Sequence, residues 1–466
     1  MERLIIGRSA QPAGRAAWGG NGMASRRGTT RARIVLASCV ALMAALLAPG
    51  EAGAMWTPDS GSWPTFRGDL THSGQPVGTS AFTAGQGGFA RLKWSVNTEY
   101  PVLGPPTVAD LDEDGVPEVV VNSSDVKVTI APPAAPDFDF THAVTALEGD
   151  DGAQDWHQDE GDSFIFALPA DNAEIDNDDK AEVVGFKGNP LLNVDDERLI
   201  ARSHTGAQQW TYQDGDWNDL GEQVVGILGA VHTANVDNEA TNPEVIFGAN
   251  EALLAISIGT QEPGCPNAGA PSADIEASSI SYFIHALNGE GGSASEQWQF
   301  TRSDALLVST PVITDVNADG KNDVLFGSGA PEGNLLGECE VHVSTDASAV
   351  DDKIIALDGN NPGQILWETE VNDNGFDRPP AASPLMAGTT AGGDKIVAFL
   401  IPVPKTLPPA QNPDRNVLIA LNARTGAELW RLDLKPATIS PLAAADLDAD
   451  GQPEIIAQVG NRLATF

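Results

Sequence analysis

Apolar and polar positions recur along this chain as two alternating strings, and each string predicts a pair of short strands. The first string is clearest at 106–121 (PTVADLDEDGVPEVVV), 311–326 (PVITDVNADGKNDVLF) and 441–456 (PLAAADLDADGQPEII). In each, an apolar run, an Asp/Gly turn and a second apolar run follow one another, which is typical of a β-hairpin. Looser copies occupy 169–184, 232–247 and 384–399.

The second string follows each copy of the first except the last, and it ends in a tryptophan. It reads AVTALEGDDGAQDW at 143–156 and LIALNARTGAELW up to Trp430, with further copies ending at Trp210, Trp298 and Trp367. A strand, an Asn/Gly turn and a strand carrying the Trp are predicted, so each repeat has four antiparallel strands. A large residue at one fixed position of every repeat indicates packing between neighbouring repeats.

We therefore predict an all-β fold, a β-propeller of four-stranded antiparallel blades, six in number with seven as the alternative. The last copy of the first string is followed only by 461–466, whereas 91–94 (RLKW) precede the first repeat without an upstream partner. An N-terminal strand that completes the last blade would close the ring and remove the exposed sheet edges. The propeller would cover 91–466, after an N-terminal extension at 55–90.

Composition and charge narrow the class of protein. The many turn residues, 48 Gly and 32 Pro, disfavour long helices, and 41% hydrophobic residues are enough for a core. The formal net charge of −39 repels phosphate backbones, so we expect no nucleic-acid partner.

The first 54 residues are predicted to be a signal peptide. Arginines up to Arg33 precede an apolar run at 34–48 and the small-residue site Ala52-Gly53-Ala54, with Met23 as a possible true start. Twin-arginine export at Arg26-Arg27 and a lipobox around Cys39 are alternatives. We expect a secreted, periplasmic or cell-surface protein, with no later run near the about 20 apolar residues of a membrane span.

The Asp/Gly turns of the first strings are candidate Ca²⁺ sites. Oxygen side chains fall at loop positions 1, 3, 5 and 9 around a turn Gly at position 6, and hard oxygen ligands in a flexible loop favour Ca²⁺. The predicted ligands of the three clearest loops are Asp110, Asp112, Asp114 and Glu118; Asp315, Asn317, Asp319 and Asp323; and Asp446, Asp448, Asp450 and Glu454. The alternative is a plain Asp-Gly hairpin turn without an ion.

Weaker copies of the same loop carry Glu174, Asp176, Asp178 and Glu182, and Asn235, Asp237, Glu239 and Glu244. The fifth repeat lacks these acids: Ala387, Thr389, Ala391 and Lys395 take the ligand positions. We expect no ion there, with Lys395 in place of the cation.

These loops resemble the FG-GAP and VCBS repeats of integrin α-subunit propellers and of many secreted bacterial proteins. The segment 326–331 (FGSGAP) is similar to the motif that names the family, and the resemblance spans about 94–466. It implies Ca²⁺ in the D-x-D-x-D-G-x-x-D/E loops and a calcium-binding module for an extracellular macromolecule. The strings TGAELW and TGAQQW, and Trp63-Pro-Thr-Phe-Arg67, also look like the docking motifs of pyrroloquinoline quinone propellers.

The candidate functions remain open at this stage. A non-enzymatic binding or adhesion module for a protein or glycan is the leading hypothesis, and a polysaccharide lyase or hydrolase is the alternative. A lyase requires Arg, Lys, Tyr or His side chains that converge on one site. A quinoprotein is disfavoured because quinone alcohol dehydrogenases carry adjacent cysteines, whereas Cys265 and Cys339 are far apart.

Two further predictions concern the face opposite the calcium loops. Cys265 and Cys339 lie in long insertions of consecutive repeats that alternation sends to the same face, which predicts a disulfide, with two thiols as the alternative. The long second-to-third connections, 122–141, 250–281, 328–351 and 400–415, are expected to be irregular loops on this face. Loops on a rigid scaffold commonly carry binding, so the macromolecular partner is expected there.

Overall fold

The computed structural model describes residues 92–466 with internal gaps. The gaps fall at 103–104, 130–136, 162–170, 177, 179, 190–192, 214–223, 227–230, 238–242, 261–270, 290–292, 304, 308, 330–332, 335–340, 346–352, 362–363, 374–375, 378–383, 404–414, 436–441, 448–452 and 460–461. The predicted signal peptide, the extension at 55–90, and Glu239, Cys265, Cys339, Asp448 and Asp450 lie outside the described residues.

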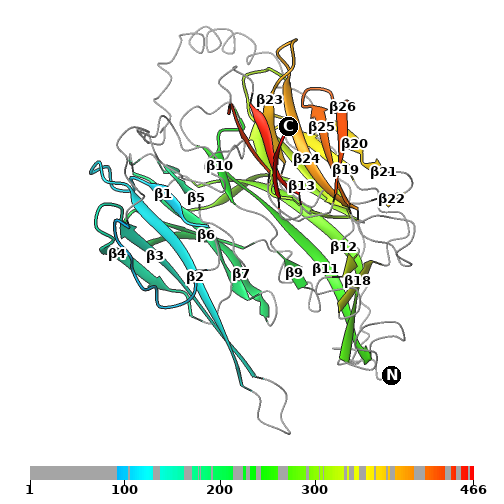
Figure 1. Ribbon diagram of the computed structural model, residues 1–466. Coiled ribbons are helices and arrows are strands. Elements are labelled where there is room, and N and C mark those ends of the chain that lie inside the picture. The colour runs from blue at the N-terminus through cyan, green and yellow to red at the C-terminus, as the bar shows by residue number, and fades with distance from the viewer. Residues whose placement is uncertain are drawn as a thin grey trace, which may run out of the picture.

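The described residues form strands and turns, with no helix that could cross a membrane. Consecutive strands pair antiparallel in repeated sheets, which confirms the predicted all-β propeller class (Figure 1). Sheet 1 contains β1 (Thr107–Ala109), β2 (Glu118–Thr129), β3 (Asp137–Glu148) and β4 (Gln154–Asp159). Sheet 2 contains β5 (Asp171–Ala173), β6 (Glu182–Asn189), β7 (Asn193–Arg202) and β8 (Gln208–Tyr212).

The next two sheets keep this order and carry additional strands. Sheet 3 contains β10 (His232–Ala234), β11 (Glu244–Thr260), β12 (Pro271–Asn288) and β13 (Ser295–Ser303), with β9 (Val224–Gly226) beside β11. β18 (Val341–Thr345) runs parallel to β12 and pairs with β17 (Gly333–Asn334). Sheet 4 contains β15 (Val312–Thr314), β16 (Asp323–Gly329), β19 (Lys353–Leu357) and β20 (Ile365–Glu370), with β14 (Leu306–Leu307) beside β16.

The C-terminal part of the chain adds two more sheets of the repeat and one small hairpin. The hairpin pairs β21 (Asn372–Asp373) with β22 (Phe376–Asp377). Sheet 5 contains β23 (Leu385–Thr389), β24 (Lys395–Val403), β25 (Arg415–Asn422) and β26 (Glu428–Leu434). Sheet 6 contains β27 (Ala443–Ala445), β28 (Glu454–Val459) and β29 (Arg462–Thr465), and therefore has three strands among the described residues.

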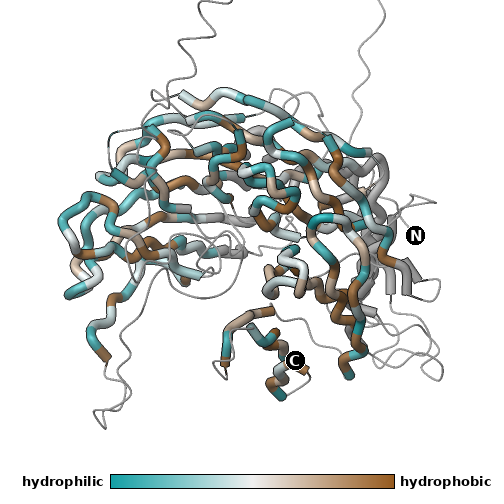
Figure 2. Tube along the Cα trace, turned by 90° about the horizontal axis from the view of Figure 1, so that it is seen from above, coloured by the Kyte–Doolittle hydropathy of each residue, from teal (hydrophilic) through white to brown (hydrophobic). Residues whose placement is uncertain are grey.

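The apolar core lies between sheets. Five clusters of buried residues each join two consecutive sheets, from sheets 1 and 2 to sheets 5 and 6. Because both faces of an inner strand are covered in this arrangement, β16 is buried at all seven positions, with the apolar run 324–326 followed by small residues. Seen from above, the sheets follow one another in an arc with apolar stretches inside them (Figure 2).

Four of the tryptophans that end the second strings are buried between neighbouring sheets, namely Trp156, Trp210, Trp298 and Trp367, whereas Trp430 is exposed. The rings of Trp156 and Trp367 come within 2.7 and 2.5 Å of the place where a Cβ would stand on Gly206 and Gly426, which lie in the β7–β8 and β25–β26 turns of the following sheets. The indole Nε1 of Trp367 also donates to the carbonyl of Ala423 at 2.7 Å. These contacts confirm the predicted packing between repeats for Trp156 and Trp367.

Trp94 makes the same contact from the N-terminal side of sheet 1. Its Nε1 donates to the carbonyl of Gly149 at 3.0 Å, and its ring lies 2.8 Å from the Cβ position of Gly152. Trp94 thus occupies the place of a fourth-strand Trp from a preceding blade, although residues 92–98 belong to no strand here. Closure of the ring through pairing of this segment with β29 stays a prediction.

The prediction of loops at the second-to-third connections is wrong over much of their length. Residues 122–129 and 137–141 continue β2 and β3, and most of 250–281 continues β11 and β12. Alternating sequences such as VKVT at 126–129 and long runs such as LLAISIG at 253–259 favour extended strands over loops. Two long hairpins result, and both extend well beyond the rest of their sheets (Figure 1).

Candidate metal centres

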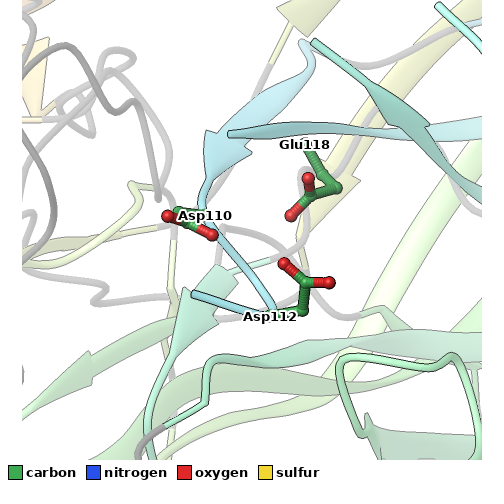
Figure 3. Close-up of side chains that lie close together, drawn as sticks. All are labelled: Asp110, Asp112 and Glu118. Carbon is green, nitrogen blue, oxygen red and sulfur yellow. The ribbon is translucent and has the colours of Figure 1, made fainter. Parts of the chain in front are cut away.

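Three carboxylates converge in the loop between β1 and β2. Oxygens of Asp110, Asp112 and Glu118 lie within 4.8 Å of one another, and the side chains face a common point (Figure 3). Asp110 and Glu118 are buried, while Asp112 is exposed. Because like charges held this close repel, the arrangement gains stability from a cation bound between them.

Backbone hydrogen bonds shape this loop around its acids. Asp110 accepts bonds from the backbone N–H of Gly115 at 2.8 Å and of Asp114 at 3.1 Å, and Asp112 accepts a second bond from Asp114 at 3.1 Å. Gly115 has a φ of 88°, in the left-handed region that glycine adopts without strain. The predicted ligand Asp114 is exposed and accepts a bond from Val116 at 2.7 Å.

The acid at loop position 9, or at position 10 in the third repeat with its one extra residue, closes the loop in every acidic repeat. Glu118 accepts a hydrogen bond at 2.7 Å from the backbone N–H of Leu111, which is loop position 2. The corresponding pairs are Glu182 with Ile175 at 3.0 Å, Glu244 with Val236 at 2.8 Å, Asp323 with Val316 at 2.8 Å, and Glu454 with Leu447 at 2.7 Å. One carboxylate oxygen is therefore committed to the fold; the other accepts from Gln209 in Glu182, from Gln297 in Glu244 and from the backbone N–H of Gly359 in Asp323.

Burial changes the acidity of these loop-closing carboxyl groups. Desolvation raises the pKa of Glu118 from 4.5 to about 7, against the opposing effect of the Leu111 hydrogen bond. Desolvation also raises the pKa of Glu182 to about 8, of Glu244 to about 7 and of Asp323 to about 6. A bound cation would favour the ionised form of each group and offset this cost.

The second repeat forms a similar cluster. Oxygens of Glu174, Asp176 and Glu182 lie within 4.8 Å of one another. Asp178 is exposed and accepts a bond from the backbone N–H of Lys180, outside this close group. From β8, the Gln209 amide donates to Asp176 at 2.8 Å and to Glu182 at 3.2 Å, so an amide hydrogen stands between two acids.

The third repeat repeats the amide contact. The Gln297 amide on β13 donates to Asp237 at 3.4 Å and to Glu244 at 3.2 Å. The Asn235 backbone carbonyl accepts a bond from the Asn322 side chain of the next repeat at 2.9 Å.

The fourth loop has the backbone geometry of the first. Asp315 accepts from the backbone N–H of Gly320 at 3.0 Å, as Asp110 does from Gly115. The Asn317 side chain donates to Asp319 at 3.3 Å and accepts from its backbone N–H at 2.8 Å. In the sixth repeat, Asp446 begins the loop and Glu454 closes it, and the positions between them fall in the gap at 448–452.

The fifth loop is held by basic side chains instead. The Lys395 amine donates to the Thr314 hydroxyl of sheet 4, and the Arg424 guanidinium donates to Asp394 at 2.6 Å. Arg424 also donates to the backbone carbonyl of Asn317 at 2.8 Å, in the neighbouring loop. Cationic side chains therefore occupy the loop whose sequence lacks the acids.

Sequence reasoning missed a contribution from the fourth strand of the first three blades. Gln209 and Gln297 directly precede Trp210 and Trp298, and the corresponding residue of the first repeat is Asp155. Desolvation and then the charge of Asp112 raise the pKa of Asp155, which places this carboxyl group near the first loop. A polar residue directly before Trp156, Trp210 and Trp298 is the sequence signal that identifies these side chains.

Comparisons with known proteins show no family for this chain. No family model matches it, and no curated protein matches it. Solved structures with a similar course of the chain include the exotype rhamnogalacturonan lyase YesX, at 13% identity and a TM-score of 0.37, over 78% of this chain and 65% of that chain. A quinohemoprotein alcohol dehydrogenase from Pseudomonas putida HK5 is similar at 12% identity and a TM-score of 0.31. The match covers 87% of this chain and 76% of that chain.

The V. cholerae biofilm matrix protein Bap1 is also similar, at 13% identity and a TM-score of 0.23, over 76% of this chain and 74% of that chain. The chain thus spans slightly less than two thirds of the YesX chain. At these values the likenesses assign no function.

Proposed function

We propose that this protein is an exported β-propeller that binds Ca²⁺ in its β1–β2-type loops and serves as a non-enzymatic binding module for an extracellular macromolecule. The observation that carries the proposal is the close group of Asp110, Asp112 and Glu118, whose all-oxygen donor set suits Ca²⁺. The resemblance of the loops to FG-GAP repeats agrees with this assignment.

The binding surface is proposed to lie at the end opposite these loops. The β2–β3 and β11–β12 hairpins extend there as long projections from a scaffold whose metal loops and third-to-fourth turns lie together at the other end (Figure 1). Projections from a rigid scaffold can reach a large partner without disturbing the core. A protein or a glycan is the expected partner.

Calcium-dependent melting tests the metal part of the proposal. If each site binds Ca²⁺ about tenfold more tightly than its free concentration, mass action adds about 1.4 kcal/mol per site to the free energy of unfolding. Asp112→Ala should remove part of this gain, whereas Asp433→Ala, an exposed acid on β26, should leave it unchanged. A melting curve that is identical in calcium and in chelator would refute calcium binding.

Removal of the hairpin tip tests the binding part. Replacement of 131–140 by a short Gly-Ser turn should abolish capture of extracellular glycans or proteins and leave the calcium response intact. Binding retained after this change and after replacement of 403–413 would place the ligand elsewhere.

A carbohydrate-active enzyme is a second candidate, and one observation favours it. Side chains of the kind a lyase requires converge between sheets 3 and 4: Tyr282 is fully buried, Arg302 donates to Glu368 at 2.8 Å, and Lys353 donates to the same acid at 3.0 Å. Appearance of unsaturated sugars from an acidic polysaccharide, and its loss in Lys353→Met, would establish this activity.

A further inference from the structure

A buried cluster of charged residues joins sheets 1 and 2 on the side away from the metal loops. Glu160, directly after β4, receives the Lys187 amine at 3.2 Å on one oxygen and the Arg202 guanidinium on the other. The side chains of Glu160 and Arg202 are 3% and 7% exposed, whereas that of Lys187 is 31% exposed. The cluster therefore reaches solvent at Lys187.

Position along the strands places this cluster well away from the loop acids. Lys187 lies five residues after Glu182 on β6, about 16 Å along an extended strand. Glu160 is held beside His142, because its backbone N–H donates to the His142 carbonyl at 2.8 Å.

Several hydrogen-bonding atoms of this cluster have no partner among the described residues. Both ring nitrogens of His142, which is 1% exposed, and the Nε of Arg202 have no hydrogen-bond partner among the described residues. Two cations, Lys187 and Arg202, share the single buried carboxylate of Glu160, while the adjacent acid Asp159 is exposed. Buried donors and charges of this kind are costly unless an acceptor reaches them.

The corresponding place between sheets 3 and 4 provides an internal comparison. Tyr282 and Arg302 stand where sheet 1 has His142 and Glu160, counted from Ala286 and Trp298, which pair as Ala146 and Trp156 do. There, the Glu368 carboxylate accepts from both Arg302 and Lys353 and is 39% exposed. The acid shared by the two cations there is thus open to solvent, unlike Glu160, and Glu370 lies opposite Lys353 across β19 and β20.

We propose that the cluster of Lys187, Arg202, Glu160 and His142 is a binding site for the carboxylate group of a small or polymer-borne acid. A carboxylate supplies two acceptor oxygens and one negative charge, which suits two cations that share one buried acid and an Arg202 Nε–H that has no acceptor among the described residues. This site deepens the proposed binding function because it names the chemistry of the ligand. It rests on that function only in placing the ligand at the end of the propeller opposite the metal loops.

Isothermal titration and ligand-observed NMR with acetate, D-galacturonate and neutral D-galactose test the site. The two acids should bind saturably to the calcium-loaded protein, and D-galactose should not. Lys187→Met should weaken binding at least tenfold. Tighter binding of D-galacturonate than of acetate would assign the ligand to sugar acids.

The control is Lys435→Met, which removes an exposed cation directly after β26 and should leave the affinity unchanged. Calcium-dependent melting of both variants verifies that each is folded. Absence of binding by both acids, or equal affinity in Lys187→Met, would overturn this site. A normal calcium response in the same samples would show that the metal-binding proposal survives.

Discussion

Calcium stabilisation of this propeller should grow with pH, because the loop-closing carboxyl groups are costly to ionise when no cation is present. Desolvation raises the pKa of Glu118 from 4.5 to about 7. A carboxyl group whose pKa is raised in the folded state stabilises the fold while it is protonated. For Glu118, this stabilisation is fully present below the unfolded-state pKa of 4.5 and is lost as the pH rises through about 7. The metal-free protein should therefore lose stability between pH 5 and pH 8.

The size of the expected stability change follows from the pKa shift of Glu118. At about 1.4 kcal/mol per pKa unit, full ionisation of Glu118 costs about 3 kcal/mol, and screening by nearby solvent reduces this to about 1–3 kcal/mol. With an unfolding entropy of about 2.1 cal/mol/K per residue, a chain of this length shifts its Tm by about 1–2 °C for each kcal/mol. Glu182 and Glu244 add contributions in the same direction, since the pKa of each is raised to about 8 and about 7.

Melting by calorimetry at pH 5 and pH 8, with calcium or with chelator, measures this linkage. Glu118→Gln keeps an acceptor for the Leu111 N–H but carries no charge, so it should raise the metal-free Tm at pH 8 and reduce the calcium response. Glu113→Gln, an exposed residue of the same loop, is the matched control and should change neither. A metal-free Tm that rises from pH 5 to pH 8, or an equal calcium shift at both pH values, would refute the reasoning.

Three other predictions concern the scaffold. Gly426→Ala should lower the free energy of unfolding by about 2 kcal/mol or more, as measured by denaturant unfolding. Gly426 has a φ of 70°, and a Cβ there would stand 2.5 Å from the Trp367 indole packed on it. If the N-terminal segment pairs with β29, Ser95→Cys with Leu463→Cys should form a disulfide and add about 3–5 kcal/mol, whereas an unlinked double variant in oxidising buffer would contradict the pairing. Thiol titration of unreduced, denatured protein should show no free Cys265 or Cys339, and two titratable thiols would exclude their disulfide.

Local patterns in the sequence were sufficient to predict the repeated sheets. Asp/Gly turns between apolar runs and a Trp at a fixed position indicate four strands in each repeat, and pairs such as Ala146 with Trp156 and Ala420 with Trp430 bear this out. The loop at 110–118 was found because its acids are close in sequence and one turn brings them together.

Contacts between distant segments could not be predicted in the same way. The glutamine amide that reaches the second acidic loop comes from the fourth strand, so its role depends on the pairing of β7 with β8. The charged cluster of Glu160 and Arg202 depends on packing between two sheets. The long β11–β12 hairpin was mistaken for a loop because Pro and Gly at its centre outweighed the alternating residues on either side.

The packing of Trp94, Trp156 and Trp367 on the glycine turn of the following sheet means that the unit of sequence and the unit of stability are offset. Trp367 belongs to the fourth repeat by sequence, but its ring is covered by the turn around Gly426 in the fifth. A fragment cut at the end of a repeat would expose that indole and lose its cover. Circular permutants opened within a second-to-third hairpin keep every such pair intact, so the chain has natural opening points inside its repeats and not at their borders.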